Sequence, residues 1–136
     1  MALSYVDANY WIYWFDERLP EHDFVDNAMQ KAIRDGAVVS TVTLMEVAHY
    51  FRTLQPKILN EKMKMITNLS TLKLIDFTST IMQSSIDLLS VYARLGLGSR
   101  DCVILATMKA VRTDTLLTHD ESFKNVKGLK IIDEIG

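Results

Sequence analysis

The sequence predicts an α/β domain of three layers (α/β/α), in which helices cover both faces of a parallel sheet of about five strands. Two observations lead to this prediction. Short runs rich in Val, Ile, Leu and Thr alternate along the chain with longer segments of helical periodicity. The strand-like runs are apolar throughout, which is typical of parallel strands buried on both faces. The length of 136 residues allows a real core, and we expect one domain over residues 1–136.

The strands are predicted from their short length and their content of Val, Ile, Leu and Thr. Because they are separated by helical segments, they should pair in parallel, and their carboxyl ends should share one edge of the sheet. In chain order the strands are expected at Leu3–Val6, Ala37–Ser40, Leu72–Ile75, Thr115–Thr118 and Leu129–Ile132.

The helices are predicted from their periodicity and their end signals. Gly36 and Gly96 follow two of them, as glycine commonly does at a helix end. The last helix is apolar almost all round, which indicates a buried helix. The expected helices are Ala8–Phe15, Glu21–Arg34, Leu44–Leu54, Lys57–Leu69, Ile81–Leu95 and Arg100–Val111.

Composition and charge limit the classes of function. The chain is 49% hydrophobic and 24% charged, which is normal for a globular protein. No apolar run approaches the roughly 20 residues that span a bilayer, and no secretory signal is evident. The single cysteine, Cys102, cannot form an internal disulfide, so we expect a cytoplasmic protein without membrane association. The formal charge of −2 does not indicate a broad basic surface for nucleic acid, although the rest of the protein carries about +2 if four acids bind cations.

Four carboxylates lie near the points where strands end and helices begin. Ligands bind outside the carboxyl edge of open α/β sheets, so acids at these points are expected to converge there. They are Asp7 in "YVDANYWI", Glu46 in "STVTLMEV", Asp101 in "SRDCVILATM" and Asp120 in "LLTHDESF".

Each acid also has a purely structural explanation, because acidic and hydroxyl side chains commonly cap helices. Taken alone, any one of the four is better explained in this way. The candidate caps are Thr43-x-x-Glu46 and Thr118-x-x-Glu121 as capping boxes, Ser99 before Asp101, and Asp7 as a simple N-cap.

The four acids together favour a cation site. Carboxylates gathered at one partly buried edge repel one another by several kcal/mol, on the order expected for protein dielectrics. Divalent cations relieve this repulsion, and carboxylate and water ligands suit Mg²⁺ or Mn²⁺. The set of acids therefore predicts a site for Mg²⁺ or Mn²⁺.

The same four segments, in this order, resemble the motifs of the PIN-domain ribonucleases. The likeness is closest to the VapC-type toxins of bacterial and archaeal toxin–antitoxin pairs, and it extends from Asp7 to the last strand. Leu105 stands where many relatives have alanine. The matching positions are Asp7 and Asn9 in the first motif, Glu46 in the second, Asp101 in the third, and Thr118, Asp120 and Phe123 in the fourth.

This resemblance implies a PIN-like fold and a metal-dependent endoribonuclease. It implies that Asp7, Glu46, Asp101 and Asp120 are catalytic ligands of Mg²⁺ or Mn²⁺, with Asn9 and Thr118 positioning them. In-line attack of a metal-activated water on phosphorus would leave 5′-phosphate and 3′-hydroxyl ends. The implied partners are an RNA substrate, an inhibitory antitoxin and often a second copy of the chain, as a homodimer.

Two surfaces follow from the residues themselves. Arg100 adjoins Asp101 and is expected to contact an RNA phosphate. The six consecutive large apolar residues Tyr10–Phe15 cannot all face one core, because a helix has a back face. We expect Trp11, Trp14 or Phe15 to contact an antitoxin segment or a second subunit. The alternative is a helix wedged between the sheet and other helices.

Other functions stay open at this point. A PIN-like domain could bind RNA or protein without cutting, or act as a stand-alone RNA-processing nuclease. A receiver domain or haloacid-type phosphatase would use Asp7 as nucleophile, but the second acid and the later lysine of those designs are not evident. His119 is more typical of a surface or packing histidine, and Cys102 of a small buried hydrophobe.

Overall fold

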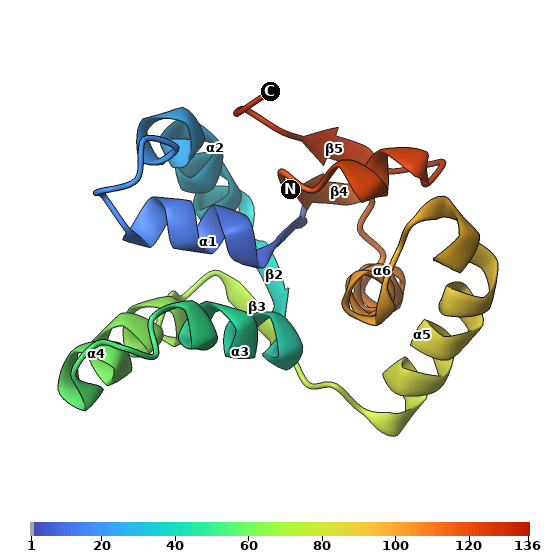
Figure 1. Cartoon of the computed structure of the whole chain (residues 1–136), viewed down its shortest axis with the longest axis horizontal. Coiled ribbons are helices and arrows are strands. Elements are labelled where there is room, and N and C mark those ends of the chain that lie inside the picture. Colours follow the sequence, from blue (N-terminus) through green and yellow to red (C-terminus); the bar gives the residue numbers. More distant parts are fainter. Residues whose placement is uncertain (1) are drawn as a thin grey trace.

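The computed structural model describes residues 2–136 and contains a five-stranded sheet of order β3-β2-β1-β4-β5 (Figure 1). All four strand pairings are parallel, so the predicted fold class is confirmed. The strands are β1 (Ser4–Val6), β2 (Ala37–Ser40), β3 (Leu72–Ile75), β4 (Thr115–Leu117) and β5 (Lys130–Ile132).

Helices connect the strands and differ from the predicted ranges mainly at their ends. No helix within residues 2–136 combines the length and apolar character needed to span a membrane. The helices are α1 (Ala8–Phe15), α2 (His22–Asp35), α3 (Thr41–Tyr50), α4 (Pro56–Thr67), α5 (Ser79–Tyr92) and α6 (Ser99–Val111), with 3₁₀ turns η1 (Ala93–Leu95) and η2 (Glu121–Asn125).

The largest difference is in α3, which begins at Thr41 and ends at Tyr50 instead of running from Leu44 to Leu54. Ser40 causes the early start, because its side chain accepts a hydrogen bond from the Val42 N–H directly after β2. This cap turns the chain into a helix at the carboxyl end of the strand and brings Glu46 close to the sheet edge.

Two cores lie on opposite faces of the sheet, as expected when successive side chains of a strand alternate. Figure 1 shows α1–α4 on one side of the sheet and α5 and α6 on the other. The first core contains Val6, Val39 and Leu117 from the strands. The second contains Tyr5, Val38 and Leu116, together with most of the buried side chains of α6.

The aromatic run of α1 packs further inward than predicted. Trp11 is 0% exposed, and its Nε1 donates a hydrogen bond to the Val6 carbonyl at 3.1 Å. The prediction of Trp11 as a partner contact is therefore wrong, because α1 packs against the sheet, α2 and α3 and has little free back face. Trp14 and Phe15, at the end of the helix, are only partly buried.

Asp16 caps the carboxyl end of α1 and links it to α3. Its carboxylate accepts two hydrogen bonds from the Arg18 guanidinium at 2.9 Å and one from the Tyr50 hydroxyl at 3.0 Å. The Arg18 hydrogen bonds are the main reason why the pKa of Asp16 lies well below its usual value. A carboxyl with a lowered pKa stabilises the fold above its ordinary pKa, and this contribution is lost as pH falls through the folded value.

We therefore expect Asp16→Asn to lower the Tm at neutral pH, with a difference from wild type that shrinks below about pH 4, near the ordinary pKa of aspartate. Thermal unfolding followed by circular dichroism across this pH range checks the prediction. The exposed neighbour Glu17 provides the control Glu17→Gln, which should change the Tm little at either pH. An Asp16→Asn difference that is the same at neutral and acid pH would count against the assigned role.

Candidate active site

The order of the strands creates a crevice at the carboxyl end of β1. The chain passes from β1 to β2 and β3 on one side, and then returns to β4 on the other side of β1. In open α/β sheets, ligands bind at such a reversal, outside the carboxyl ends of the strands. Asp7 follows β1 directly, and the segment from Thr118 to Asp120 follows β4.

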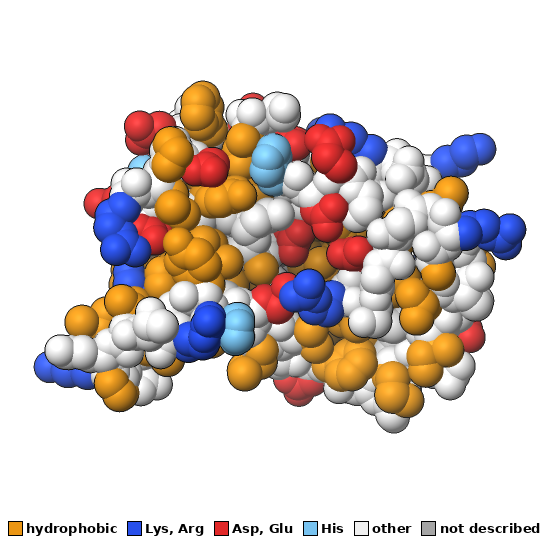
Figure 2. Space-filling model, viewed as in Figure 1, with side chains coloured by type: hydrophobic (Ala, Val, Ile, Leu, Met, Phe, Trp, Pro, Cys, Tyr) orange, Lys and Arg blue, Asp and Glu red, His pale blue; other side chains and the backbone are white. Residues whose placement is uncertain are grey.

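A pocket of about 1000 Å³ lies at this edge, and all four predicted acids line it. Figure 2 shows acidic side chains gathered in the middle of this face, with a cationic side chain beside them. The structure therefore brings together residues that are far apart in the sequence. They are Asp7 at the start of α1, Glu46 on α3, Asp101 on α6 and Asp120 before η2.

Asp7 is the most buried of the four, with 8% of its surface exposed. One carboxylate oxygen accepts the Ala8 N–H at 2.7 Å, and the other accepts the Thr118 hydroxyl at 2.7 Å. Burial nevertheless raises the pKa of Asp7 to about 6, and the charges of Glu46 and Asp120 act in the same direction. Thr118 itself is fully buried and fixes the orientation of this carboxylate.

Glu46 and Asp101 contribute the acids from α3 and α6. Glu46 Oε2 accepts a hydrogen bond from Arg100 Nη1 at 2.8 Å. Asp101 Oδ2 accepts the Gly98 N–H at 2.9 Å, which ties it to the start of α6. Burial raises the pKa of both carboxyls; at Glu46 the Arg100 charge opposes this rise and the Asp101 charge adds to it.

Asp120 and Asn9 complete the side of the pocket next to β4. Asp120 Oδ1 accepts hydrogen bonds from the Ser122 N–H at 3.0 Å and the Ser122 hydroxyl at 2.8 Å. The side-chain oxygen of Asn9 accepts the His119 N–H at 3.4 Å, so Asn9 links α1 to the loop after β4. Asn9 also lines the pocket, where its position allows it to orient a ligand.

The helix-start explanations are confirmed for Asp101, which lies in the first turn of α6 and accepts the Gly98 N–H, and for Asp7, which is the N-cap of α1 and a pocket residue at once. A capping role and a ligand role are therefore compatible for this residue. At three other helix starts the N-cap differs from the expected residue. The N-cap of α3 is Ser40 instead of Thr43, that of α6 is Gly98 instead of Ser99, and that of η2 is Asp120 instead of Thr118.

His49 and Arg52 also line the pocket, although neither is among the site residues predicted from the sequence. His49 follows Glu46 by three residues, a spacing that places both on one face of a helix and could have identified it. His119 contacts the Asp133 carboxylate through Nδ1 at 3.0 Å and is not among the pocket residues, which agrees with a packing role.

The donor chemistry of the pocket fits a hard divalent cation, because carboxylate oxygens are its preferred protein ligands. Within residues 2–136, no three Asp, Glu, His or Cys side chains are close enough in their present positions to enclose an ion. Each of the four carboxylates instead accepts a hydrogen bond from the protein. An ion that keeps several water ligands, as Mg²⁺ does, suits such separated acids better than a closed cage.

Comparison with known proteins identifies the family. Residues 4–129 match the PIN domain, whereas no curated protein sequence matches significantly. Solved structures of low sequence identity share the fold, and they include the following three. Rickettsia felis VapBC2, bound to a promoter DNA fragment, has a TM-score of 0.71 at 22% identity and covers 96% of this chain and 97% of its own.

The second is Mycobacterium tuberculosis VapC20, described as a sarcin-ricin loop cleaving toxin. Its TM-score is 0.75 at 12% identity, and the match covers 88% of this chain and 92% of the VapC20 chain. The third is FitAcB from Neisseria gonorrhoeae, with a TM-score of 0.72 at 16% identity. The match covers 97% of this chain and 98% of the FitAcB chain. Because the family match extends over nearly the whole sequence, this chain belongs to the PIN domain family.

Proposed function

We propose that this protein is a Mg²⁺- or Mn²⁺-dependent endoribonuclease and the toxin of a toxin–antitoxin pair. The main support is the pocket at the carboxyl edge of the sheet, where carboxylates from four separate segments converge. An acid-lined pocket repels a phosphodiester unless cations are present, so this arrangement favours metal-assisted phosphate chemistry. Membership of the PIN family and the likeness to VapC-type structures support the same assignment.

In this proposal Asp7, Glu46, Asp101 and Asp120 hold one or two ions. The metal, when bound, supplies charge stabilisation at the phosphate and a water of lowered pKa. Thr118 holds Asp7 in one orientation through its 2.7 Å hydrogen bond. Asn9 secures the loop that carries Asp120. The cleaved RNA carries 5′-phosphate and 3′-hydroxyl ends, and a toxin of this kind acts in the cytoplasm.

The cationic side chains of the same pocket suit an RNA backbone. Arg52 and Arg100 both line it, and guanidinium groups bind phosphate oxygens through paired hydrogen bonds. We assign them to substrate binding, whereas the overall charge of −2 provides no broad attraction for RNA. Affinity for RNA would then depend on the pocket itself.

A matched pair of aspartate variants tests the function. We expect Asp101→Asn to reduce Mn²⁺-dependent cleavage of an end-labelled RNA by more than about 100-fold, beyond the loss usual for indirect partners of a metal. Asp114→Asn changes the same residue type before β4, at the opposite edge of the sheet, and should leave the rate unchanged. Full activity of a folded Asp101→Asn protein, or activity that survives EDTA, would refute the proposal.

Trp14 and Phe15 are the residues that we propose for partner contact. They line a second pocket of about 590 Å³ beside Lys62 and Met65, and Met65 is 58% exposed. Aromatic and methionine side chains are enriched in protein interfaces. A related fold has been solved as a toxin–antitoxin complex from Klebsiella pneumoniae, which makes an antitoxin segment the natural occupant to propose. We also propose a homodimer.

A further inference from the structure

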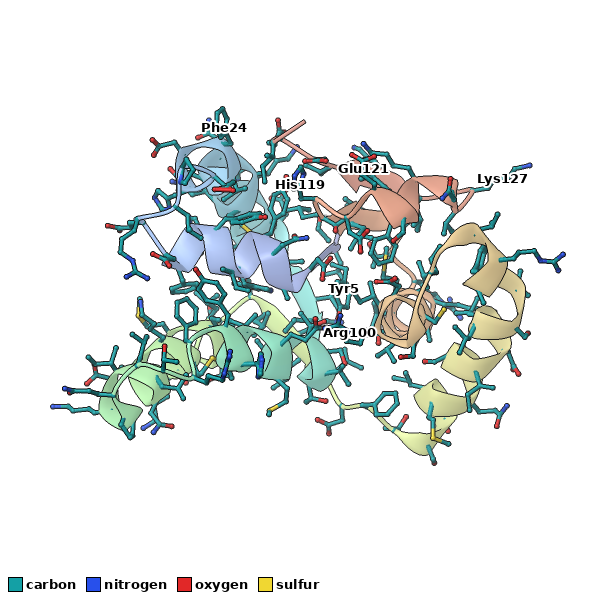
Figure 3. The ribbon with its side chains drawn as sticks, in the orientation of Figure 1. Tyr5, Phe24, Arg100, His119, Glu121 and Lys127 are labelled. Carbon is teal, nitrogen blue, oxygen red and sulfur yellow. The ribbon has the colours of Figure 1, made fainter. Side chains whose placement is uncertain are left out.

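We propose that Arg100 is a substrate-positioning residue that exchanges Glu46 for a phosphate oxygen of the RNA, so that RNA and metal bind cooperatively. This inference rests on the proposed function. The Arg100–Glu46 ion pair joins α6 to α3 at the pocket, and Figure 3 shows Arg100 between these two helices. The pair therefore lies where metal and substrate would meet.

The two partners differ in how freely they can move. The Arg100 side chain is 70% exposed, whereas the Glu46 side chain is 25% exposed. An ion pair with such an exposed cation is weak, because water competes for the guanidinium at little cost. Glu46 is held on a helix whose start is fixed by the Ser40 cap. Arg100 is therefore the partner that can leave, while Glu46 stays in the pocket.

A metal ion and an RNA phosphate each compete with one partner of this ion pair. A cation approaching Glu46 Oε2 competes with the guanidinium nitrogen that lies 2.8 Å from it. A phosphate competes with the carboxylate for Arg100, because a guanidinium recognises both in a similar paired geometry. Once released, Arg100 remains beside the pocket, because the next residue, Asp101, is tied to the start of α6.

Cooperativity follows from this competition. RNA that takes Arg100 frees Glu46 for the ion, and an ion on Glu46 frees Arg100 for RNA. By linkage, each ligand must raise the affinity of the other by the same factor. Without RNA, the Arg100–Glu46 pair keeps the affinity for metal low.

Arg52 supplies a matched control in the same pocket. Its Nη1 donates to the His49 carbonyl at 2.8 Å, and it forms no ion pair among the residues that the structure describes. Arg52→Gln thus removes the same charge as Arg100→Gln without releasing a carboxylate. A difference in Mn²⁺ affinity between the two variants is therefore due to the Arg100–Glu46 ion pair and not to the general loss of positive charge.

The test is Mn²⁺ binding, measured by isothermal titration calorimetry in the absence of RNA. We expect Arg100→Gln to bind Mn²⁺ about fivefold or more tightly than Arg52→Gln, the lower end of common coupling effects. A short oligodeoxythymidylate, as a phosphodiester probe, should raise the Mn²⁺ affinity of wild type and of Arg52→Gln by a larger factor than that of Arg100→Gln. Circular dichroism verifies that each variant is folded.

The outcomes separate this inference from the proposed function. If wild type binds Mn²⁺ and Asp7→Asn weakens that binding, but Arg100→Gln and Arg52→Gln are equal, the exchange is refuted and the metal site stands. If neither wild type nor Arg100→Gln binds Mn²⁺, with or without the oligodeoxythymidylate, both proposals are refuted. An equal effect of the oligodeoxythymidylate on all three proteins also refutes the exchange.

Discussion

Asp7→Asn is expected to abolish RNA cleavage and, at the same time, to make the metal-free protein more stable at neutral pH. Asp7 is 8% exposed, and burial raises its pKa to about 6, so at pH 7 the fold holds a carboxylate that prefers water. Asparagine keeps the shape of the side chain. Its amide oxygen can accept the Ala8 N–H, and the Thr118 hydroxyl can rotate to accept from the amide nitrogen.

The sign of the pH dependence follows from the raised pKa of Asp7. Between its ordinary value of 3.8 and the folded value of about 6, the folded protein holds a proton that the unfolded chain has lost. The stability of wild type should therefore fall as pH rises through this interval and stay lower above it. Asp7→Asn should then raise the free energy of unfolding by roughly 1–3 kcal/mol near pH 7.5, which is the energetic equivalent of a pKa change of this size.

Urea denaturation in EDTA at about pH 4 and about pH 7.5 measures this effect. The two proteins should differ little at the acid pH and clearly at the higher one. Adding Mn²⁺ should stabilise wild type more than Asp7→Asn, because a ligand stabilises the state that binds it. A variant that is less stable than wild type at the higher pH would show that the hydrogen bonds of the Asp7 carboxylate outweigh the cost of its burial, and would contradict the expected gain in stability.

Trp11→Ala is expected to destabilise the protein by about 3–5 kcal/mol, the usual cost of deleting a large core aromatic. Trp11 is 0% exposed and is packed between the sheet and neighbouring helices. The change also leaves the Val6 carbonyl without its side-chain donor. A loss of this size is a large part of the stability of a small domain, so we expect a marked fall in the urea midpoint.

Trp14→Ala is the matched comparison on the same helix. Trp14 is partly exposed, and its Nε1 donates to Asp26 Oδ1 at 3.0 Å near the surface. We expect Trp14→Ala to lower the free energy of unfolding by less than half as much as Trp11→Ala does. Urea denaturation of both variants measures the contrast, and equal losses would contradict the division of the aromatic run into a core part and a surface part.

Much of the fold could be predicted because its signals are local. The five strands are short apolar runs, and all five appear in the sheet within a residue of their expected ends. Gly36 and Gly96 adopt positive φ angles of 120° and 92°, a conformation that glycine permits at helix ends. The early start of α3 does not follow from the local pattern, because Ser40 is both the last residue of β2 and the N-cap of α3.

The remaining details depend on tertiary contacts that sequence patterns do not contain. The burial of Trp11 depends on α2 and α3 covering α1, and the aromatic run alone predicted an exposed back face. The four acids could be placed at one edge from their positions after the strands. The pairing of Glu46 with Arg100 joins residues 54 positions apart, and no local spacing indicates it.

The central claim is that the carboxylates at the β1–β4 crevice bind a divalent cation. Anomalous scattering from crystals grown with Mn²⁺ tests it most directly. The account predicts a manganese peak inside the pocket, with Asp7 and at least one of Glu46, Asp101 and Asp120 among its ligands. Manganese found only at other surfaces, with none in this pocket at saturating concentration, would contradict the account.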